Sequence, residues 1–450
     1  MLSKLHTYIF IVGLLAIGFM AVMTYEKAID LMTMIPVGAF ITQICLILFF
    51  SRDDVWKSYK KPSEITLFFT VLVYTLMLGT VFMLISYYYD GDTFMFSKTD
   101  AMAYYTESMR VTDEGFLEVM TDLTQRKAFD DWGAYFFDCL MMSIIPSKFF
   151  LNAIYMVLGA TSSVLLYRIA QHYMPDIYAF IAGLGYGTSS FLIFYSCTFL
   201  KESLFVFLVI STVYHFYQYL TSPSRFSLLA TALCLVCVLF FRPAVAGMLA
   251  VSALAYYGIT QRGMAISLFI YMGAAVAIVV SMTMMKGAVD AYTAGGDVDA
   301  VIAYRSNENY SGSFNYFVSF FGAYLGPFPT IFSKEPGVPS HLQFYGSGLT
   351  YRLFFMFPFW YGVYTAYKKK ALELLPIILF IVLEMCATAY IVASMELRKV
   401  LLHVPFMYIL SFYGIYHVFK SERAIMAFKY FNVVFVLGVL FLWNVIKVKT

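Results

Sequence analysis

Long apolar runs are the feature that most limits how this chain can fold. Each has roughly 16 to 25 residues, and a helix of about 20 residues crosses the hydrocarbon core of a bilayer. Short charged links separate the runs, so the sequence predicts about 13 membrane-spanning helices. The runs lie near residues 6–25, 31–50, 65–89, 149–170, 177–199, 203–220, 226–241, 244–259, 264–284, 351–367, 374–393, 401–418 and 426–446.

Composition agrees with this interpretation. The chain is 61% hydrophobic and 13% charged, whereas soluble domains carry about 25% charged residues. Backbone groups in lipid must be satisfied within each segment, which favours helices. We therefore predict an all-α polytopic membrane protein whose residues 1–450 form a single transmembrane domain. The net charge of +3 gives no reason to expect a nucleic-acid partner, and we expect no cofactor, because no nucleotide-binding or metal-ligand motif occurs.

Two long polar segments interrupt the apolar pattern. The first, residues 90–148, holds ten acidic and four basic residues between Asp90 and Asp131. Within it, Phe116, Met120 and Leu123 have helical spacing with acidic residues between them, which predicts an amphipathic surface helix. We expect this helix to roof a site and to have no catalytic role.

The second polar segment, residues 285–350, includes the short apolar piece 314–333. The sequence Gly-Pro-Phe-Pro at 326–329 would break a helix there, so we expect this piece to be re-entrant. The apolar piece 133–146 is also short, and we expect it to be re-entrant or interfacial.

The basic links predict the orientation. Short loops rich in lysine and arginine remain cytoplasmic, and the two most basic links are SRDDVWKSYKK at 51–61 and KKK at 368–370. The N-terminus is then cytoplasmic and the 90–148 loop lies outside. Counting through the runs brings five basic positions and one acid to the same outer side: Lys201, Glu202, Arg242, Arg305, Arg398 and Lys399.

Three acidic residues are candidates for a catalytic carboxylate. Asp90, Asp92 and Asp100 lie near the predicted outer surface, where a carboxylate can act as general base toward a hydroxyl. Each has an equally good structural interpretation. Asp100 has the character of a helix N-cap, and Asp90 and Asp92 would form a solvated turn around Gly91.

The outer basic residues are candidates for binding phosphate. Arg242 interrupts an apolar stretch, and guanidinium groups hold phosphate with two hydrogen bonds. Lys201 and Glu202 could bind a ligand or simply mark a helix start at the interface. Arg305 lies in a loop rich in hydroxyl and amide groups that would suit a sugar. His403, one turn inside a late run after Arg398 and Lys399, is more often a structural hydrogen-bonder than a ligand-binding group.

Several segments together resemble a known group of proteins. They are DAMAYY (100–105), DWGAYFF (131–137), SKFFLNAIYMVLGATSSVLLYRIA (147–170), FLKESLFVFLV (199–209), FFRPAV (240–245), GPFP (326–329) and ELRKVLLHVPF (396–406). The set, across most of residues 65–420, resembles bacterial integral-membrane glycosyltransferases of the GT-C type. It is also similar to Wzy-like O-antigen and capsule polysaccharide polymerases.

The resemblance implies an enzyme of the bacterial inner membrane with its active site on the outer face. Its partners would be a polyprenyl-phosphate- or pyrophosphate-linked sugar donor, a glycan acceptor, membrane lipids and other envelope polysaccharide assembly proteins. The essential acid of the GT-C type would be Asp90, Asp92 or Asp100. The donor-binding basic residues would be Lys201, Arg242, Arg305 and Arg398. No soluble C-terminal domain follows the last run, so we expect no metal.

These features favour a polysaccharide polymerase. A transferase that moves a single sugar from polyprenyl phosphate is the closest alternative. A flippase or transporter would favour internal repeats, and none is detectable. An acyltransferase would need a catalytic histidine in a polar funnel, for which His403 is the candidate.

Overall fold

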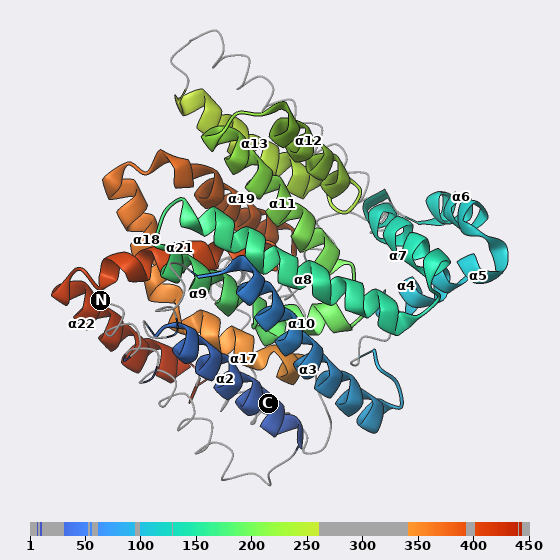
Figure 1. Ribbon diagram of the computed structural model, residues 1–450, viewed down its shortest axis with the longest axis horizontal. Coiled ribbons are helices and arrows are strands. Elements are labelled where there is room, and N and C mark those ends of the chain that lie inside the picture. The colour runs from blue at the N-terminus through green and yellow to red at the C-terminus, as the bar shows by residue number, and fades with distance from the viewer. Residues whose placement is uncertain are drawn as a thin grey trace.

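The computed structural model describes residues 31–52, 62–94, 100–127, 129–260, 341–392 and 401–439, with a few single positions besides. Throughout these ranges the regular structure is helical, without a strand (Figure 1). Four helices there have the length and apolar composition to cross a membrane: α3 (Glu64–Asp90), α8 (Lys148–Gln171), α11 (Glu202–Thr221) and α13 (Pro243–Thr260). The prediction of a helical protein is confirmed in these ranges, and the four candidate spans support the prediction of a membrane protein.

Some predictions fall outside the described residues. These are the runs 6–25 and 264–284, nearly all of the second polar segment with Arg305 and GPFP, and the pair Arg398 and Lys399.

Helix α8 lies at the centre of the bundle and packs against α3, α9 (Asp176–Gly187), α10 (Ser190–Cys197) and α11. Glycines allow part of this close packing. A Cβ added at Gly187 would lie 2.3 Å from Ser163 Oγ and 2.6 Å from a Val71 methyl group. Outward, α3 exposes large apolar side chains such as Phe69, Met77 and Leu84, as a lipid-facing helix should.

The apolar run 177–199 is not the single helix that we predicted. It forms α9 and α10, which meet at an angle of 47° around Thr188 and Ser189. The hydroxyl of Thr188 donates to Leu184 O at 2.7 Å, so the polar residues at the bend are partly satisfied within the chain. Apolar residues continue on both sides of this short polar stretch, so the hydrophobic pattern alone does not show the break.

The later helices are α12 (Arg225–Leu239), α17 (His341–Phe354), α18 (Met356–Lys369), α19 (Leu375–Val392), α21 (Val404–Val418) and α22 (Glu422–Tyr430), and α2 (Leu31–Phe50) lies beside α17. Helices α18 and α21 approach closely, because a Cβ at Gly414 would overlap Pro358 O at 1.8 Å. Two predicted boundaries were wrong. The run 351–367 begins inside α17 and breaks at Phe355, and His403 precedes α21 instead of lying one turn inside it.

The acidic segment forms a helical arm on one side of the bundle (Figure 1). It comprises α4 (Asp100–Met109), α5 (Val111–Glu114), α6 (Phe116–Arg126), the 3-10 turn η2 (Phe129–Asp131) and α7 (Trp132–Ile144). The amphipathic helix predicted around Phe116 and Leu123 is α6, which buries Val119 and Leu123. Helix α6 packs on α7, and α7 joins the arm to the bundle.

Candidate functional site

Lys201 lies in the turn between α10 and α11, at a strained point of the backbone. Two residues earlier, Phe199 has φ +60° and a fully buried side chain. A bulky residue in this left-handed region costs about 1–3 kcal/mol and persists only where its surroundings hold it. Tyr105 of the arm contributes to holding it, with its ring edge-on to Phe199 at 5.5 Å between centroids. The strained turn brings Lys201 to the junction of the bundle and the arm.

Asp131, at the start of α7, is the carboxylate that contacts Lys201. Lys201 Nζ donates to Asp131 Oδ1, and Tyr104 OH donates to the same oxygen at 2.7 Å. The Asp131 side chain is 31% exposed and that of Lys201 is 11% exposed. Burial favours the protonated acid, but the charge of Lys201 and the two hydrogen bonds outweigh it and lower the pKa of Asp131. Asp131 is therefore ionised at neutral pH.

Arg242 reaches the same place from the turn between α12 and α13. Gly133 N donates to Phe240 O at 3.1 Å, and the Phe241 ring fills the space beside Gly133. The turn and the start of α7 are thereby joined, and the charge of Arg242 also lowers the pKa of Asp131.

The guanidinium of Arg242 has an unusual environment. It lies over the ring of Phe205 at 5.5 Å from the centroid. Within the described residues no carboxylate forms a salt bridge or hydrogen bond with it. An aromatic ring can position a guanidinium without occupying its N–H donors. The donors of Arg242 thus remain available beside the Lys201–Asp131 pair.

The polar cluster continues into the bundle. Glu202 is 2% exposed, and its charge adds to burial and Asp131 in raising the pKa of Tyr104. Deeper, Tyr155 OH donates to Asp138 Oδ1. Burial raises the pKa of Asp138 to about 8, so this acid is protonated at neutral pH. Asp131, directly before α7, and Asp138, within α7, thus differ in charge.

The structure brings Lys201, Glu202 and Arg242 into one cluster, as the sequence predicted. The acid that meets them is Asp131, which the sequence analysis did not single out. Asp131 opens the DWGAYFF segment, but the sequence alone does not distinguish it from the nine other acids that precede it in the polar segment.

The three predicted acids occupy other places. Asp92 Oδ1 accepts a hydrogen bond from Phe94 N at 2.8 Å, in the turn where Gly91 has φ +72°. Asp90 ends α3. Asp100 begins α4, and its charge reaches Tyr135 on α7. The turn around Gly91 matches its structural interpretation. Asp100 is the first residue of α4, and its N-cap interpretation stays a prediction, as does a catalytic role for any of the three.

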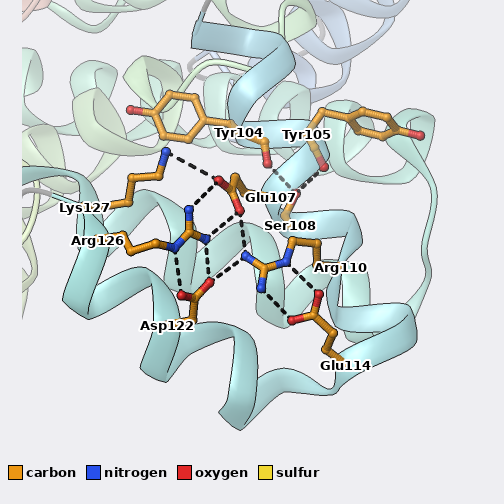
Figure 2. Close-up of polar contacts among 9 residues, drawn as sticks. All are labelled: Tyr104, Tyr105, Glu107, Ser108, Arg110, Glu114, Asp122, Arg126 and Lys127. Atoms are coloured by element: carbon orange, nitrogen blue, oxygen red, sulfur yellow. Dashed lines mark hydrogen bonds and ion pairs between the residues drawn. The ribbon is translucent and has the colours of Figure 1, made fainter.

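An ion network fixes the shape of the arm. Figure 2 shows Glu107 of α4 between Arg110 and Arg126, with Lys127 nearby. Arg110 also pairs with Asp122 of α6 at 2.7 Å. Hydrogen bonds from Arg126 and Arg110 overcome partial burial and lower the pKa of Glu107. Because these contacts tie α4 to α6, they hold the helix that carries Tyr104.

A second polar pair lies between α19 and α21. His403 is fully buried, and its Nδ1 contacts Glu384 Oε2. Thr388 Oγ1 donates to the other carboxylate oxygen at 3.2 Å. In the described part of the chain, His403 Nε2 has no hydrogen-bond partner. A carboxylate at Nδ1 fixes the imidazole orientation and makes Nε2 the reactive nitrogen.

An apolar cavity of about 50 Å³ lies among α11, α12, α13, α19 and α21. Its lining includes Thr212 of α11 and Leu249 of α13. Since a helix rises ~1.5 Å per residue, these lie about 15 Å from Glu202 and about 10 Å from Arg242. Phe380 and Phe406, which also line the cavity, are one turn from the Glu384–His403 pair. The cavity therefore lies farther along the helices that follow Lys201 and Arg242, and it does not reach the cationic cluster.

Within the described ranges, no group of three or more His, Cys, Asp and Glu side chains is arranged to hold a metal ion. No protein family matches this sequence, and no curated protein matches it either.

Proposed function

We propose that the protein is an integral-membrane glycosyltransferase with a GT-C-like architecture of about 13 spans. Its donor would be a sugar linked to a polyprenyl phosphate or pyrophosphate. The observation that carries this proposal is Arg242, a guanidinium held over Phe205 beside the Lys201–Asp131 pair, with no carboxylate partner among the described residues. Such a group is suited to a doubly hydrogen-bonded phosphate.

The leaving group is the lipid phosphate, whose negative charge grows as the bond to the anomeric carbon breaks. Arg242 and Lys201 would stabilise that charge, as positioned cations do in other transfer reactions. Asp131 and Tyr104 fix Lys201 before substrate binds. The cations thus need little rearrangement during the reaction.

The apolar cavity supports a lipid carrier. It lies among helices that include α11 and α13, which begin directly after Lys201 and Arg242. Its apolar lining is suited to a small part of an isoprenoid chain. A soluble nucleotide-sugar has no apolar chain that could contact such a lining.

The attacking group would be a hydroxyl of a second glycan. Its oxygen forms the new bond to the anomeric carbon, the phosphate leaves with the electron pair, and the hydroxyl proton passes to a carboxylate. The sequence predicts Asp100 or Asp92 for this role. Asp131 is a further candidate, because its side chain is partly exposed and lies beside the cations.

We place the site on the outer face of the bacterial inner membrane, following the basic links at 51–61 and 368–370. The favoured reaction is polymerisation of lipid-linked oligosaccharide units, together with other envelope polysaccharide assembly proteins. Transfer of a single sugar would use the same cluster. The two differ in the acceptor, and glycan length distinguishes them.

The test is a gene-deletion strain complemented with variants. Envelope glycans limited to one repeat unit indicate a polymerase, whereas glycans that lack one sugar indicate a single-sugar transferase. Lipid-linked units trapped on the cytoplasmic leaflet indicate a flippase. Arg242→Ala should reproduce the deletion, and Arg225→Ala, which changes an exposed arginine on α12, should restore wild-type glycan. Unchanged glycans in the deletion strain would refute the proposal.

Acyl transfer is a second candidate, favoured by the Glu384–His403 pair. A histidine oriented by a carboxylate can activate a hydroxyl for acylation. The predicted polar funnel is not what surrounds it, because His403 is fully buried near an apolar cavity. Envelope glycans of normal length that lack acyl groups in the deletion strain would favour this function.

A further inference from the structure

A cluster of basic side chains lies at the opposite end of the bundle from Lys201. Tyr217, 15 residues after Glu202 on α11, contacts Glu373 O through its hydroxyl, and Tyr173 OH donates to the same oxygen at 3.3 Å. Fifteen residues of helix span about 23 Å. Glu373 follows Lys368, Lys369 and Lys370 closely. The lysine run is therefore near the far membrane surface.

Three basic groups from different elements converge there. Lys369, the last residue of α18, has its Nζ 3.3 and 3.4 Å from the two ring nitrogens of His417 in α21. His417 is 7% exposed. Lys420, in the turn after α21, lies over the ring of Tyr416 at 3.8 Å. Two ammonium groups thus lie close to one imidazole.

The described part of the chain supplies no carboxylate that neutralises this cluster. Among the described residues none forms an ion pair with Lys369 or Lys420. The basic residue Arg168, at the same end of the bundle, is different. It forms two hydrogen bonds with Glu64, at 3.0 and 2.5 Å. Positive groups held together without a counter-charge repel one another, so an anion should bind between them.

We propose that Lys369, His417 and Lys420 form a binding site for a phosphate group. Two ammonium groups close to one imidazole supply N–H donors and positive charge that suit an oxyanion such as phosphate. The phosphate could belong to an anionic phospholipid headgroup or be free in solution, and the surroundings favour the lipid. Tyr364 and Tyr367 of α18 are 54% and 83% exposed beside the lysines. Aromatic residues of this kind mark the level of lipid headgroups.

The site is independent of the proposed glycosyl transfer, because it lies on the other side of the bundle. Binding is measured by native mass spectrometry of the full-length protein in detergent, with phosphatidylglycerol, phosphatidylcholine or inorganic phosphate added. We expect phosphatidylglycerol to bind tightest. The variant Lys369→Gln with Lys420→Gln should weaken its binding about 30-fold at low salt, because each basic group near an anionic surface gives roughly a fivefold gain.

The matched control is Arg225→Gln with Lys429→Gln, which removes the same charge from exposed positions and should retain the preference. Equal binding of the two phospholipids, or unchanged binding in the Lys369 and Lys420 variant, would overturn the proposal. If inorganic phosphate competes as well as phosphatidylglycerol, the phosphate site stands and its ligand is the soluble anion. Should the double variant fail to fold, Lys420→Gln alone gives the same test, because Lys420 is exposed outside the helices.

Discussion

The arginines of the arm and Arg242 have opposite surroundings. Arg110 bonds Glu107, Glu114 and Asp122 at distances from 2.6 to 2.9 Å, so acidic side chains engage its donors. Arg242 has a ring beneath it and no acidic partner within the described residues. The comparison distinguishes two roles of arginine. Arg110 stabilises the arm, because acidic side chains of the arm accept hydrogen bonds from its guanidinium. The guanidinium donors of Arg242 remain available for a ligand.

Lys201→Met should give the largest effect. It removes a cation from the proposed phosphate site, and loss of one such group costs about 100- to 1000-fold in rate. It also leaves the Asp131 carboxylate half-buried without its ion pair, which destabilises the fold by about 1–3 kcal/mol. Glycan synthesis in the complemented deletion strain and thermal unfolding of the purified protein measure the two effects.

The double variant Lys201→Met with Asp131→Asn separates the two causes. Removing both charges should restore most of the stability, because no unpaired charge remains. Activity should remain low. Recovery of activity together with stability would mean that Lys201 has only a structural role.

Arg242→Lys comes next and directly tests the contrast between the arginines. Lysine keeps the charge but cannot form two parallel hydrogen bonds to a phosphate, so we expect activity about tenfold below wild type. Thermal stability should not change, because Arg242 has no acidic partner to lose in the part of the chain that the structure describes. Arg110→Lys is the matched substitution in the arm and should leave activity near wild type. Equal losses in both variants would show that Arg242 is no different from the arm arginines.

Sequence patterns found the cations more readily than the acid. Arg242 and Lys201 interrupt apolar runs, so their cost in lipid makes them conspicuous. Asp131 is one of ten acids in a polar segment, and local sequence does not indicate which of them packs against the turns at 201 and 242. The contact joins residues 70 positions apart, and tertiary packing brings them together. The strained Phe199 has no sequence signal, because its φ results from tertiary packing.

The helix predictions show a similar division. Apolar length predicted α3, α8, α11 and α13 closely, because burial in lipid dominates their sequence. It did not predict the bend at Thr188, where the neighbours are protein instead of lipid. A helix surrounded by other helices can stop in the middle of an apolar run, since its polar groups find partners inside the bundle. The same reason explains the break at Phe355.

Asp131 and Asp138 should make contributions to folding stability that depend on pH with opposite signs. The pKa of Asp131 is lowered, so its stabilisation is present above an unfolded value of about 4 and disappears as pH falls through the folded value. Asp138, with a pKa raised to about 8, keeps its proton in the folded state while the unfolded chain ionises. The contribution of Asp138 to stability should therefore fall as pH rises from 4 to 8.

Asn variants test both signs. Asp131→Asn should remove the decline in melting temperature on the acidic side, and Asp138→Asn should remove the decline toward pH 8 with little loss of stability at neutral pH. Melting curves between pH 3 and 9 give the comparison. A large loss of stability at pH 7 in Asp138→Asn, with none in Asp131→Asn, would reverse the assignment of charge.

The smallest effect should come from the arm itself. Glu107→Gln weakens contacts to Arg110, Arg126 and Lys127, which lie at the surface, where single ion pairs contribute little and salt screens them. We expect faster proteolysis between α4 and α6, a severalfold effect that 0.5 M salt would reproduce in the wild type. Glycan synthesis should fall only slightly, because Tyr104 would still contact Asp131. The arm network is structural if the effect follows salt in this way. If Glu107→Gln abolishes activity while proteolysis is unchanged, Glu107 acts in the site, and the contrast between the arm and Arg242 does not hold.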